Sequence, residues 1–291
     1  MNDPSQKSVS NQPSRREFLK RSSAVAAGAS LAGSLGLARS AHAAGSDVVK
    51  IALIGCGGRG TGAAIEALSN KGGAKVKLVA MADAFRDRVD VCLKSIESRI
   101  TNKELIDVPE SRKFTDLNCH EGAIAADVDM VLLCGPPGFR PAQFEAAVKA
   151  GKHVFMEKPV ATDGPGVRRI IAANEEAKKK GLLVAVGHHL RHEDKHREVV
   201  QRIHDGAIGK LSYLRAYFNS AGVWTRPRKP EQTEMQFQVR NWYYFTWLSG
   251  DHIVEQHVHD LDVCNWIHGG TPVEAQGAGG REVRKGKEEY G

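Results

Sequence analysis

Short apolar runs alternate with segments of helical periodicity over the first two thirds of the chain. The expected strands lie at 49–54, 75–82, 112–115, 128–134, 153–156 and 182–186. The expected helices between them lie at 61–69, 86–99, 141–150 and 164–180. Strands that alternate with helices form a parallel sheet covered on both faces. The pattern therefore predicts an α/β fold with a doubly wound parallel sheet over residues 47–187.

The pattern changes from about residue 188 onward. The expected pieces are a helix at 193–205, a strand-like run at 211–219, an irregular Pro- and Arg-containing stretch at 226–234, an aromatic-rich stretch at 241–248, a helix near 255–268 and a last strand-like run around 273–277. Residues 188–291 are expected to form an α+β substrate domain. Because the chain stops soon after the last expected strand, we expect this domain to be incomplete at its C-terminal end.

A glycine-rich turn, Gly55-Cys56-Gly57-Gly58-Arg59-Gly60, follows the first expected strand and leads into a helix. In a dinucleotide-binding turn of this spacing, Gly55 permits the tight bend and Gly57 lets the backbone approach the pyrophosphate, while Gly60 lets helix and strand pack closely. The N–H groups at the helix start then face the phosphates. The residues expected to contact the cofactor here are Gly55, Gly57, Gly58, Arg59 and Gly60. An ordinary βα turn is the alternative that this motif alone leaves open.

An acidic residue, Asp83, ends the second expected strand. It stands slightly beyond the ~20-residue spacing typical of the carboxylate that binds the adenosine ribose. A carboxylate repels a 2′-phosphate and so favours NAD, but Arg86 and Arg88 are near enough in the sequence to leave NADP open. The expected cofactor is therefore NAD or NADP.

The first 43 residues have the features of an export signal. Ser14-Arg15-Arg16-Glu17-Phe18-Leu19-Lys20 matches the twin-arginine pattern, an Ala- and Gly-rich run follows at 22–38, and Ala41-His42-Ala43 fits a cleavage site. A disordered basic tail is the alternative. Gly and Ser interrupt the run too often for a membrane span. We expect export to the periplasm, with a mature chain that starts near Ala44 and has no stable membrane span.

The formal charge of +7 gives little support to a nucleic-acid partner. Six of the 41 basic and two of the 34 acidic side chains lie in residues 1–43, so this short segment carries +4 of the total. The small remainder is spread over a long chain, and we expect no nucleic-acid binding. The five cysteines show no paired spacing, so buried thiols are expected in place of a disulfide framework or a zinc site.

The stretch Gly151-Lys152-His153-Val154-Phe155-Met156-Glu157-Lys158-Pro159 resembles the hallmark motif of the Gfo/Idh/MocA oxidoreductases, the family of glucose-fructose oxidoreductase and inositol dehydrogenase. The glycine turn and Gly135-Pro136-Pro137-Gly138 precede it as in that family. Downstream, Glu255-x-x-x-His259-x-x-Asp262 resembles the family's second motif. The resemblance covers residues 48–280. It implies a Rossmann domain, a substrate domain, and hydride transfer between NAD(P) and a hydroxyl or carbonyl of a sugar, cyclitol or related polyol.

The resemblance also implies roles for single residues. Lys158 would hydrogen-bond the reacting oxygen, His259 would take the hydroxyl proton, and Glu255 would share a helix face with His259 to orient it or hold another hydroxyl. Asp262 would reach the same substrate pocket. Relatives suggest a cis peptide before Pro159. The further residues that the resemblance places against the cofactor are Pro136, Glu157 and Lys158.

Other candidates lie between the two motifs. By alignment with the family, His189 and Arg191 lie where the chain turns toward substrate, so one of them is expected to line the pocket; a solvated surface is the alternative. Trp242 or Tyr244 could stack on a sugar face, although such aromatic runs are more often core or interface. His257-x-His259 suggests a metal site, but residues i and i+2 of a helix face apart, so no metal is expected.

Two departures from the family pattern bear on activity. Glu255 stands where relatives usually carry Asp, and Arg140 stands where a histidine is common. Two rival functions stay open: an NAD-dependent glycoside hydrolase of the same fold, and a carbohydrate-binding protein without catalysis. Relatives often pair through the sheet of the second domain, so a homo-oligomer is also expected.

Overall fold

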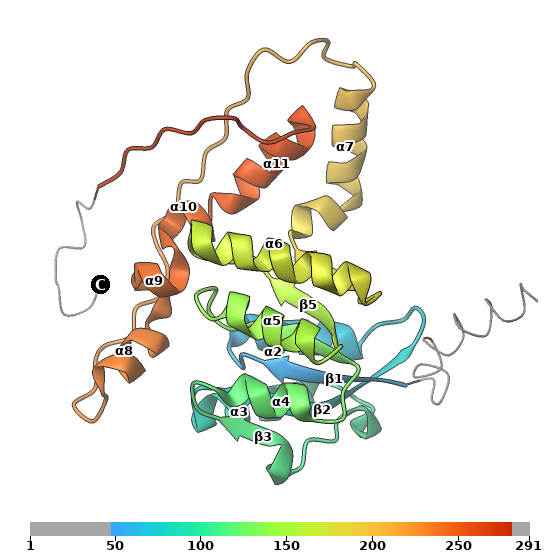
Figure 1. Cartoon of the computed structure of the whole chain (residues 1–291), viewed down its shortest axis with the longest axis vertical. Coiled ribbons are helices and arrows are strands. Elements are labelled where there is room, and N and C mark those ends of the chain that lie inside the picture. Colours follow the sequence, from blue (N-terminus) through green and yellow to red (C-terminus); the bar gives the residue numbers. More distant parts are fainter. Residues whose placement is uncertain (1–47, 281–291) are drawn as a thin grey trace, which may run out of the picture. The chain divides into compact units, whose positions relative to one another are not determined.

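The computed structural model describes residues 48–280 (Figure 1). The expected signal segment at 1–43 lies outside the described residues, as do the last eleven residues of the expected second domain.

Six parallel strands form one sheet in the order β3-β2-β1-β4-β5-β6. The strands are β1 (Val48–Ile54), β2 (Lys75–Asp83), β3 (Lys113–Thr115), β4 (Met130–Leu133), β5 (His153–Glu157) and β6 (Val184–Gly187). This is the doubly wound order in which the chain switches direction beside β1. The Rossmann-type parallel sheet expected from the sequence is therefore confirmed.

Helices cover both faces of the sheet. They are α2 (Gly58–Leu68), α3 (Arg86–Arg99), α4 (Cys119–Ala125), α5 (Arg140–Lys149) and α6 (Gly164–Lys179), with short 3₁₀ turns η1 (Lys103–Leu105) and η2 (Glu110–Arg112). Ile51 and Leu53 of β1 pack with α2 and α3, while Ala52 and Ile54 pack with α4, α5 and α6. Successive side chains of a strand point to opposite faces of the sheet. The apolar run 51–54 therefore packs into a hydrophobic core on each face.

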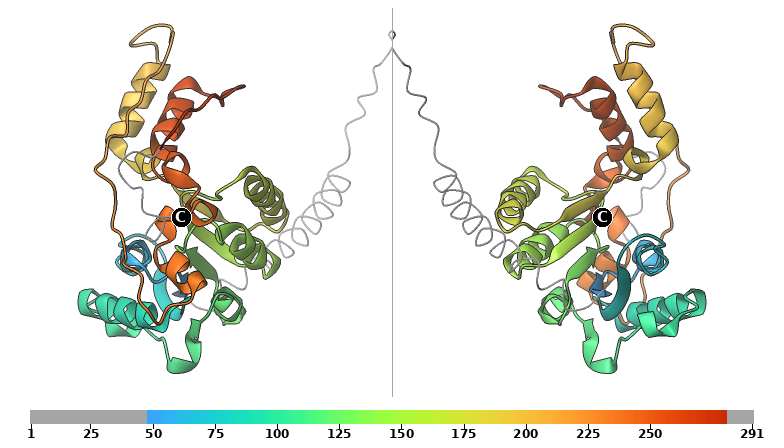
Figure 2. Two further views of the ribbon diagram at one scale, coloured as in Figure 1. Left: turned by 90° about the vertical axis from the view of Figure 1, so that its left-hand side faces the viewer. Right: turned by 90° about the vertical axis from the view of Figure 1, so that its right-hand side faces the viewer.

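The second segment, residues 188–280, is mainly helical. Its elements are η3 (His189–His192), α7 (Asp194–His204), α8 (Glu234–Arg240), η4 (Trp242–Tyr244), α9 (Thr246–Ser249), α10 (Asp251–Glu255) and α11 (Val258–His268). Helices α7 and α11 lie side by side in Figures 1 and 2, and His204 Nε2 lies 3.1 Å from the carbonyls of Trp266 and Ile267. Helix α8 begins with a capping box in which Thr233 and Gln236 bond each other's backbone N–H.

The two strand-like runs expected in this segment are wrong. Residues 211–219 and 273–277 have no regular secondary structure, and Tyr213 and Val273 are exposed at 77% and 105%. A strand needs a neighbour to pair its backbone, and no strand of the described part lies beside either run. The apolar side chains predict a strand, but they do not tell whether a second strand lies beside it to pair its backbone.

The helix expected near 255–268 is found as α11, but it begins at Val258, because the chain breaks between α10 and α11. The Glu255 carbonyl accepts a bond from Lys158 Nζ at 2.5 Å, and the His259 N–H donates to Gln256 instead. This replaces the i to i+4 bond that would continue the helix. Glu255 and His259 therefore belong to different helices and do not share one helical face.

No helix between residues 48 and 280 is both long and apolar enough to cross a membrane.

Candidate functional site

The glycine turn between β1 and α2 has the close backbone contacts of a dinucleotide site. Gly55 has φ +98°, and a Cβ there would lie 2.3 Å from the amide nitrogen of Gly135. A Cβ on Gly60 would lie 1.9 Å from the Gly55 carbonyl oxygen. At Gly57 and Gly58 the position of a Cβ is open, with no heavy atom within 4 Å, so the first turn of α2 presents bare backbone. These residues fit a pyrophosphate at the helix N-terminus.

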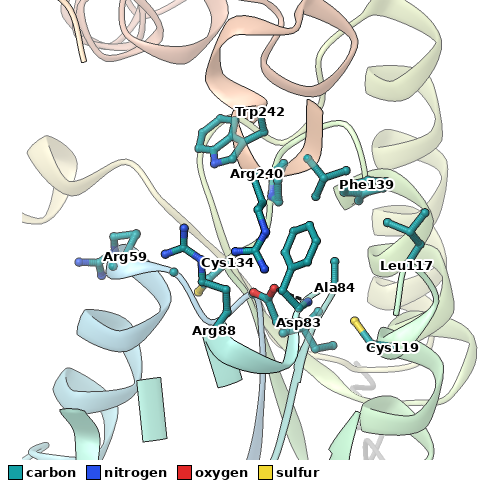
Figure 3. Close-up of a pocket in the computed structure, with 18 of the residues that line it drawn as sticks. Arg59, Asp83, Ala84, Arg88, Leu117, Cys119, Cys134, Phe139, Arg240 and Trp242 are labelled. Atoms are coloured by element: carbon teal, nitrogen blue, oxygen red, sulfur yellow. Dashed lines mark hydrogen bonds between the residues drawn. The ribbon is translucent and has the colours of Figure 1, made fainter. Parts of the chain in front are cut away.

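A cavity of about 300 Å³ opens beside this turn (Figure 3). The second segment forms one wall of it. The residues that line it include Gly55, Gly57, Asp83, Arg88, Pro136, Trp224, Arg226, Arg240 and Trp242. A site at the C-terminal ends of β1, β2 and β4 is where a sheet of this order binds its ligands.

Asp83 ends β2 at the centre of that cavity. Its carboxylate accepts the Cys56 N–H at 2.8 Å and the Phe85 N–H at 3.0 Å, so it fixes the glycine turn and the start of α3. Burial raises the pKa of Asp83, and the two backbone bonds oppose that shift. The position fits a carboxylate beside the adenosine ribose.

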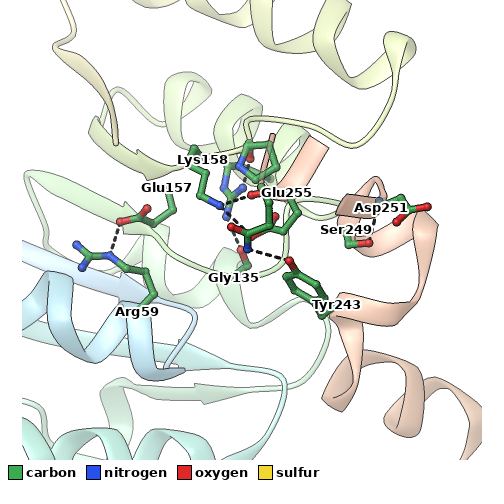
Figure 4. Close-up of polar contacts among 11 residues, drawn as sticks. Arg59, Gly135, Glu157, Lys158, Tyr243, Ser249, Asp251 and Glu255 are labelled. Carbon is green, nitrogen blue, oxygen red and sulfur yellow. Dashed lines mark hydrogen bonds and ion pairs between the residues drawn. The ribbon is translucent and has the colours of Figure 1, made fainter. Parts of the chain in front are cut away.

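Arg59, the expected cofactor residue on α2, makes one ion pair across the turn and one within its own helix. Its guanidinium lies 2.6 Å from Glu157 at the end of β5 (Figure 4). It also lies 2.9 Å from Glu66 on α2. These two carboxylates raise the pKa of Arg59. Glu157 thus holds Arg59, and through it the start of α2, against the end of β5.

Lys158 follows β5 and contacts the second segment. Its Nζ donates to the Glu255 carbonyl at 2.5 Å and to the Glu255 carboxylate at 3.1 Å (Figure 4). An ammonium has three donors, so one is left for a ligand. Burial raises the pKa of Glu255, and its second carboxylate oxygen is buried with no hydrogen-bond partner among the described residues. The Lys158–Pro159 peptide is cis, as expected from relatives.

His259, on α11, lies among cationic and aromatic neighbours. Its ring centroid is 5.0 Å from that of His189 and 6.4 Å from that of His188. Burial lowers the pKa of His259 to about 4, with further lowering from Lys158 and the two histidines. The imidazole is therefore neutral near pH 7 and can accept a proton.

The other expected substrate residues are divided between two places. Arg191 pairs with Asp262 at 2.7 Å, and His189 joins His259, so these four lie together at η3 and α11. Trp242 instead lines the cavity that contains Asp83. Its role in substrate binding stays a prediction that this location does not favour.

Arg140, noted as a departure from the family pattern, is a buried connector between two turns. Its guanidinium donates to the carbonyls of Gly135 and Pro159. Burial lowers its pKa to about 10. It therefore joins the Gly-Pro-Pro-Gly turn to the turn that carries Lys158.

Four cavity residues of the second segment were missed from the sequence: Trp224, Arg226, Val239 and Arg240. For Arg226 the signal was the Arg- and Pro-containing composition of 226–234, which does not tell where an irregular chain runs. In the described part of the chain, no group of three or more His, Cys, Asp or Glu side chains is arranged to hold a metal ion.

Two family models match the chain in succession. The Gfo/Idh/MocA model for an oxidoreductase family with an NAD-binding Rossmann fold matches residues 49–188, and the model for the Gfo/Idh/MocA C-terminal domain matches residues 196–290.

Similar proteins include sugar and cyclitol enzymes. The dTDP-3,4-didehydro-2,6-dideoxy-alpha-D-glucose 3-reductase of Actinomadura kijaniata is 34% identical over 39% of this chain and 31% of its own length. The inositol 2-dehydrogenase of Rhizobium meliloti (strain 1021) is 25% identical over 77% of this chain and 56% of its own. The chain thus spans about half the length, or less, of these curated relatives.

Among solved structures, scyllo-inositol dehydrogenase from Lactobacillus casei with bound NAD(H) and scyllo-inositol matches with a TM-score of 0.54. It is 24% identical, and the match covers 76% of this chain and 56% of that one. At this identity the likeness supports the fold. The two consecutive family models show that this chain belongs to the Gfo/Idh/MocA family of NAD-binding oxidoreductases.

Proposed function

We propose that the protein transfers a hydride between a nicotinamide nucleotide, NAD or NADP, and a hydroxyl or carbonyl carbon of a sugar, cyclitol or related polyol. The observation that carries the proposal is that Glu255 holds the Lys158 ammonium at 2.5 and 3.1 Å, near enough to His259 for its charge to help lower the pKa of that imidazole. The relatives that act on inositol and on a dideoxy sugar support the substrate class.

The two side chains divide the work of the reaction. In the oxidation direction, His259 accepts the hydroxyl proton while the C–H bond gives up its hydride. The nicotinamide, when bound, supplies the hydride acceptor. The free N–H of Lys158 stabilises the negative charge that develops on the reacting oxygen. In the reverse direction His259 returns the proton and Lys158 polarises the carbonyl.

Glu255 has two roles in the proposed reaction, one toward Lys158 and one toward the substrate. Its carbonyl and one carboxylate oxygen hold the Lys158 ammonium, and its second oxygen, buried without a partner in the described part, can accept a substrate hydroxyl. A polyol brings several hydroxyl groups, so one can react while another fills this acceptor.

The test is the reduction of added NAD and NADP with a panel of inositols, aldoses and deoxy sugars. We expect a substrate-dependent increase in reduced nicotinamide, and a loss of about 100-fold or more in kcat for His259→Asn, which removes the base. Lys158→Met should lose activity as strongly, and His259→Asn should keep its affinity for nucleotide.

His268→Asn is the matched control, because His268 is an exposed histidine at the end of the same helix. It should leave activity unchanged. Release of free sugar from a glycoside without net nucleotide reduction would replace the proposal with glycoside cleavage. Sugar binding that survives loss of both Lys158 and His259, without any turnover, would replace it with a binding protein.

We also propose that the chain is exported by the twin-arginine pathway and that copies associate through the second segment. The export proposal is supported by Arg15 and Arg16 and by the Ala-x-Ala site at 41–43. Replacing both arginines by lysine should keep the protein in the cytoplasm. The molar mass in solution, measured by light scattering, tests the association.

A further inference from the structure

Three arginines from two parts of the chain line the nucleotide cavity, close enough to one another for their charges to interact. Arg88 comes from α3, Arg226 from the irregular stretch after α7, and Arg240 from the end of α8. Figure 3 shows Arg88 and Arg240 beside the carboxylate of Asp83. The second segment thus brings positive charge to the place where the adenosine ribose is expected.

Only one of these arginines has a carboxylate partner. Arg240 forms a two-pronged ion pair with Asp87, at 2.6 and 3.0 Å, and lies 3.9 Å above the Phe85 ring. Its charge is therefore compensated inside the protein.

Arg226 and Arg88 are different. Within residues 48–280 no carboxylate lies at ion-pair distance from either guanidinium. Arg226 lies 4.6 Å above the Trp224 ring, and its Nε is buried with no hydrogen-bond partner in the described part. Burial, Arg88 and Arg240 together lower the pKa of Arg226. Half-buried cations that repel each other are stabilised by an anion placed between them.

Asp83 does not supply that anion. Both of its oxygens already accept backbone N–H groups, from Cys56 and Phe85. It can receive a ribose hydroxyl, but it leaves the donors of Arg226 without an acceptor. A phosphate on the ribose offers three oxygens to a planar guanidinium, whose fork of N–H donors can bind two of them at once.

We propose that Arg88 and Arg226 bind the 2′-phosphate of NADP and that the chain therefore prefers NADP to NAD. The inference rests on the proposed function and adds the identity of the cofactor to it. With NAD in the cavity, Arg226 would keep its buried, unpartnered Nε. With NADP, the dianionic charge of the phosphate is shared by the two free arginines, whose attraction outweighs the repulsion from the Asp83 carboxylate, and the second segment takes part in cofactor selection.

The experiment measures the affinity of the full chain for NADP and NAD by titration calorimetry, with 2′,5′-ADP, 3′,5′-ADP and 5′-AMP as short probes. We expect NADP to bind about 10-fold or more tightly than NAD, as for hydrogen bonds to a charged group. The 2′,5′ isomer should bind better than the 3′,5′ isomer of equal charge, and 5′-AMP should bind worst.

Arg226→Gln and Arg88→Gln should each weaken NADP by about 10-fold while changing the affinity for NAD by less than about 3-fold. Arg228→Gln is the matched control. It removes a charge two residues away on an exposed side chain that pairs with Glu234 and does not line the cavity, so it should change neither affinity.

Three results would overturn the proposal in different ways. Equal or better binding of NAD by the native chain removes the cofactor preference but leaves the proposed oxidoreductase function in place. Equal weakening of both nucleotides by Arg226→Gln assigns the arginine to another part of the nucleotide. Failure of both nucleotides to bind rejects the inference and the proposed function together.

Discussion

At the residue scale, proton transfer in this site depends on the environment of one imidazole. His259 is half-buried, and Lys158, His189 and His188 all oppose its protonation, while Asp262 favours it less strongly. The result is a pKa of about 4 in place of the ordinary value of 6.5. A base that stays neutral over the whole working range needs no activation step before it accepts a proton.

We predict that kcat/KM for polyol oxidation stays level from about pH 7 down to about pH 5, because a pKa lowered in this way keeps the base unprotonated. The rate should fall only as the pH approaches 4. A histidine of ordinary pKa would already lose about 10-fold by pH 5.5. The measurement is kcat/KM against pH at saturating nucleotide, with circular dichroism at each pH to confirm that the chain stays folded. Half-maximal activity near pH 6.5 would contradict the expected environment of His259.

The sequence predicted the site residues that belong to short motifs. It did not predict the site residues that lie in stretches without regular secondary structure. Lys158 and His259 belong to motifs that resemble the family's, and Asp83 ends a clear apolar strand. Arg226 and Trp224 come from a stretch with no regular secondary structure, so no periodicity states which cavity they line.

At the element scale, the turn between β1 and α2 shows how two glycines of one helix differ. A Cβ on Gly60 would lie 1.9 Å from the Gly55 carbonyl oxygen, and this backbone atom has no room to yield. A Cβ on Gly62 would lie 3.5 Å from the flexible end of Arg59. Packing between β1 and α2 therefore restricts the residue at position 60. At position 62 only the helix propensity of the residue matters.

We predict that Gly60→Ala destabilises the protein by about 1–3 kcal/mol or more, the usual cost of forcing atoms into a packed space. Gly62→Ala should be neutral or stabilise the protein by up to about 1 kcal/mol, since alanine is the better helix former. Urea denaturation followed by circular dichroism gives both values. A similar change in the two variants would mean that the strand and the helix are not packed as closely as described here.

Helices and strands were predicted correctly where an apolar run marks the segment and a glycine marks its end. Every expected strand of the sheet was found to within a few residues, and α6 begins at the cap Asp163 and is followed by Gly181 with φ +67°. The break between α10 and α11 was missed because its cause is distant in sequence. The Glu255 carbonyl accepts a hydrogen bond from Lys158, 97 residues away in the sequence, and not from the backbone N–H that would continue the helix.

At the scale of the whole described part, the second segment contacts the sheet domain along the C-terminal ends of its strands. Arg240 pairs with Asp87, Lys158 binds Glu255, and the Gly138 N–H donates to the Leu248 carbonyl at 2.9 Å. Each contact joins a turn of the sheet domain to a short helix of the second segment. The family resemblance predicted two such parts, but which turn meets which helix depends on tertiary packing that the sequence pattern does not contain.

Gly138 is the position where this packing is tightest. A Cβ there would lie 2.5 Å from the Trp247 carbonyl oxygen and 3.0 Å from the Leu248 Cα, both backbone atoms of α9. Phe139 packs edge-on against the Trp247 ring at 5.8 Å, so the turn and the helix also share an aromatic contact. Any side chain at 138 has to push α9 away from the turn.

We predict that Gly138→Ala loosens the second segment and leaves the sheet domain folded. Because α10 follows α9 directly, the displacement should also weaken the hold of Glu255 on Lys158, so turnover should fall more than nucleotide affinity. Amide hydrogen exchange should speed up across 237–255 and stay slow in β1 and β4, since local opening follows local packing. Gly135→Ala is the control in the same turn, where the nearest atom to a Cβ is the side-chain oxygen of Gln143 at 4.0 Å. Faster exchange in the strands as well would show that the second segment and the sheet unfold as one cooperative unit, whereas an unchanged pattern in Gly138→Ala would mean that α9 does not rest on this turn in solution.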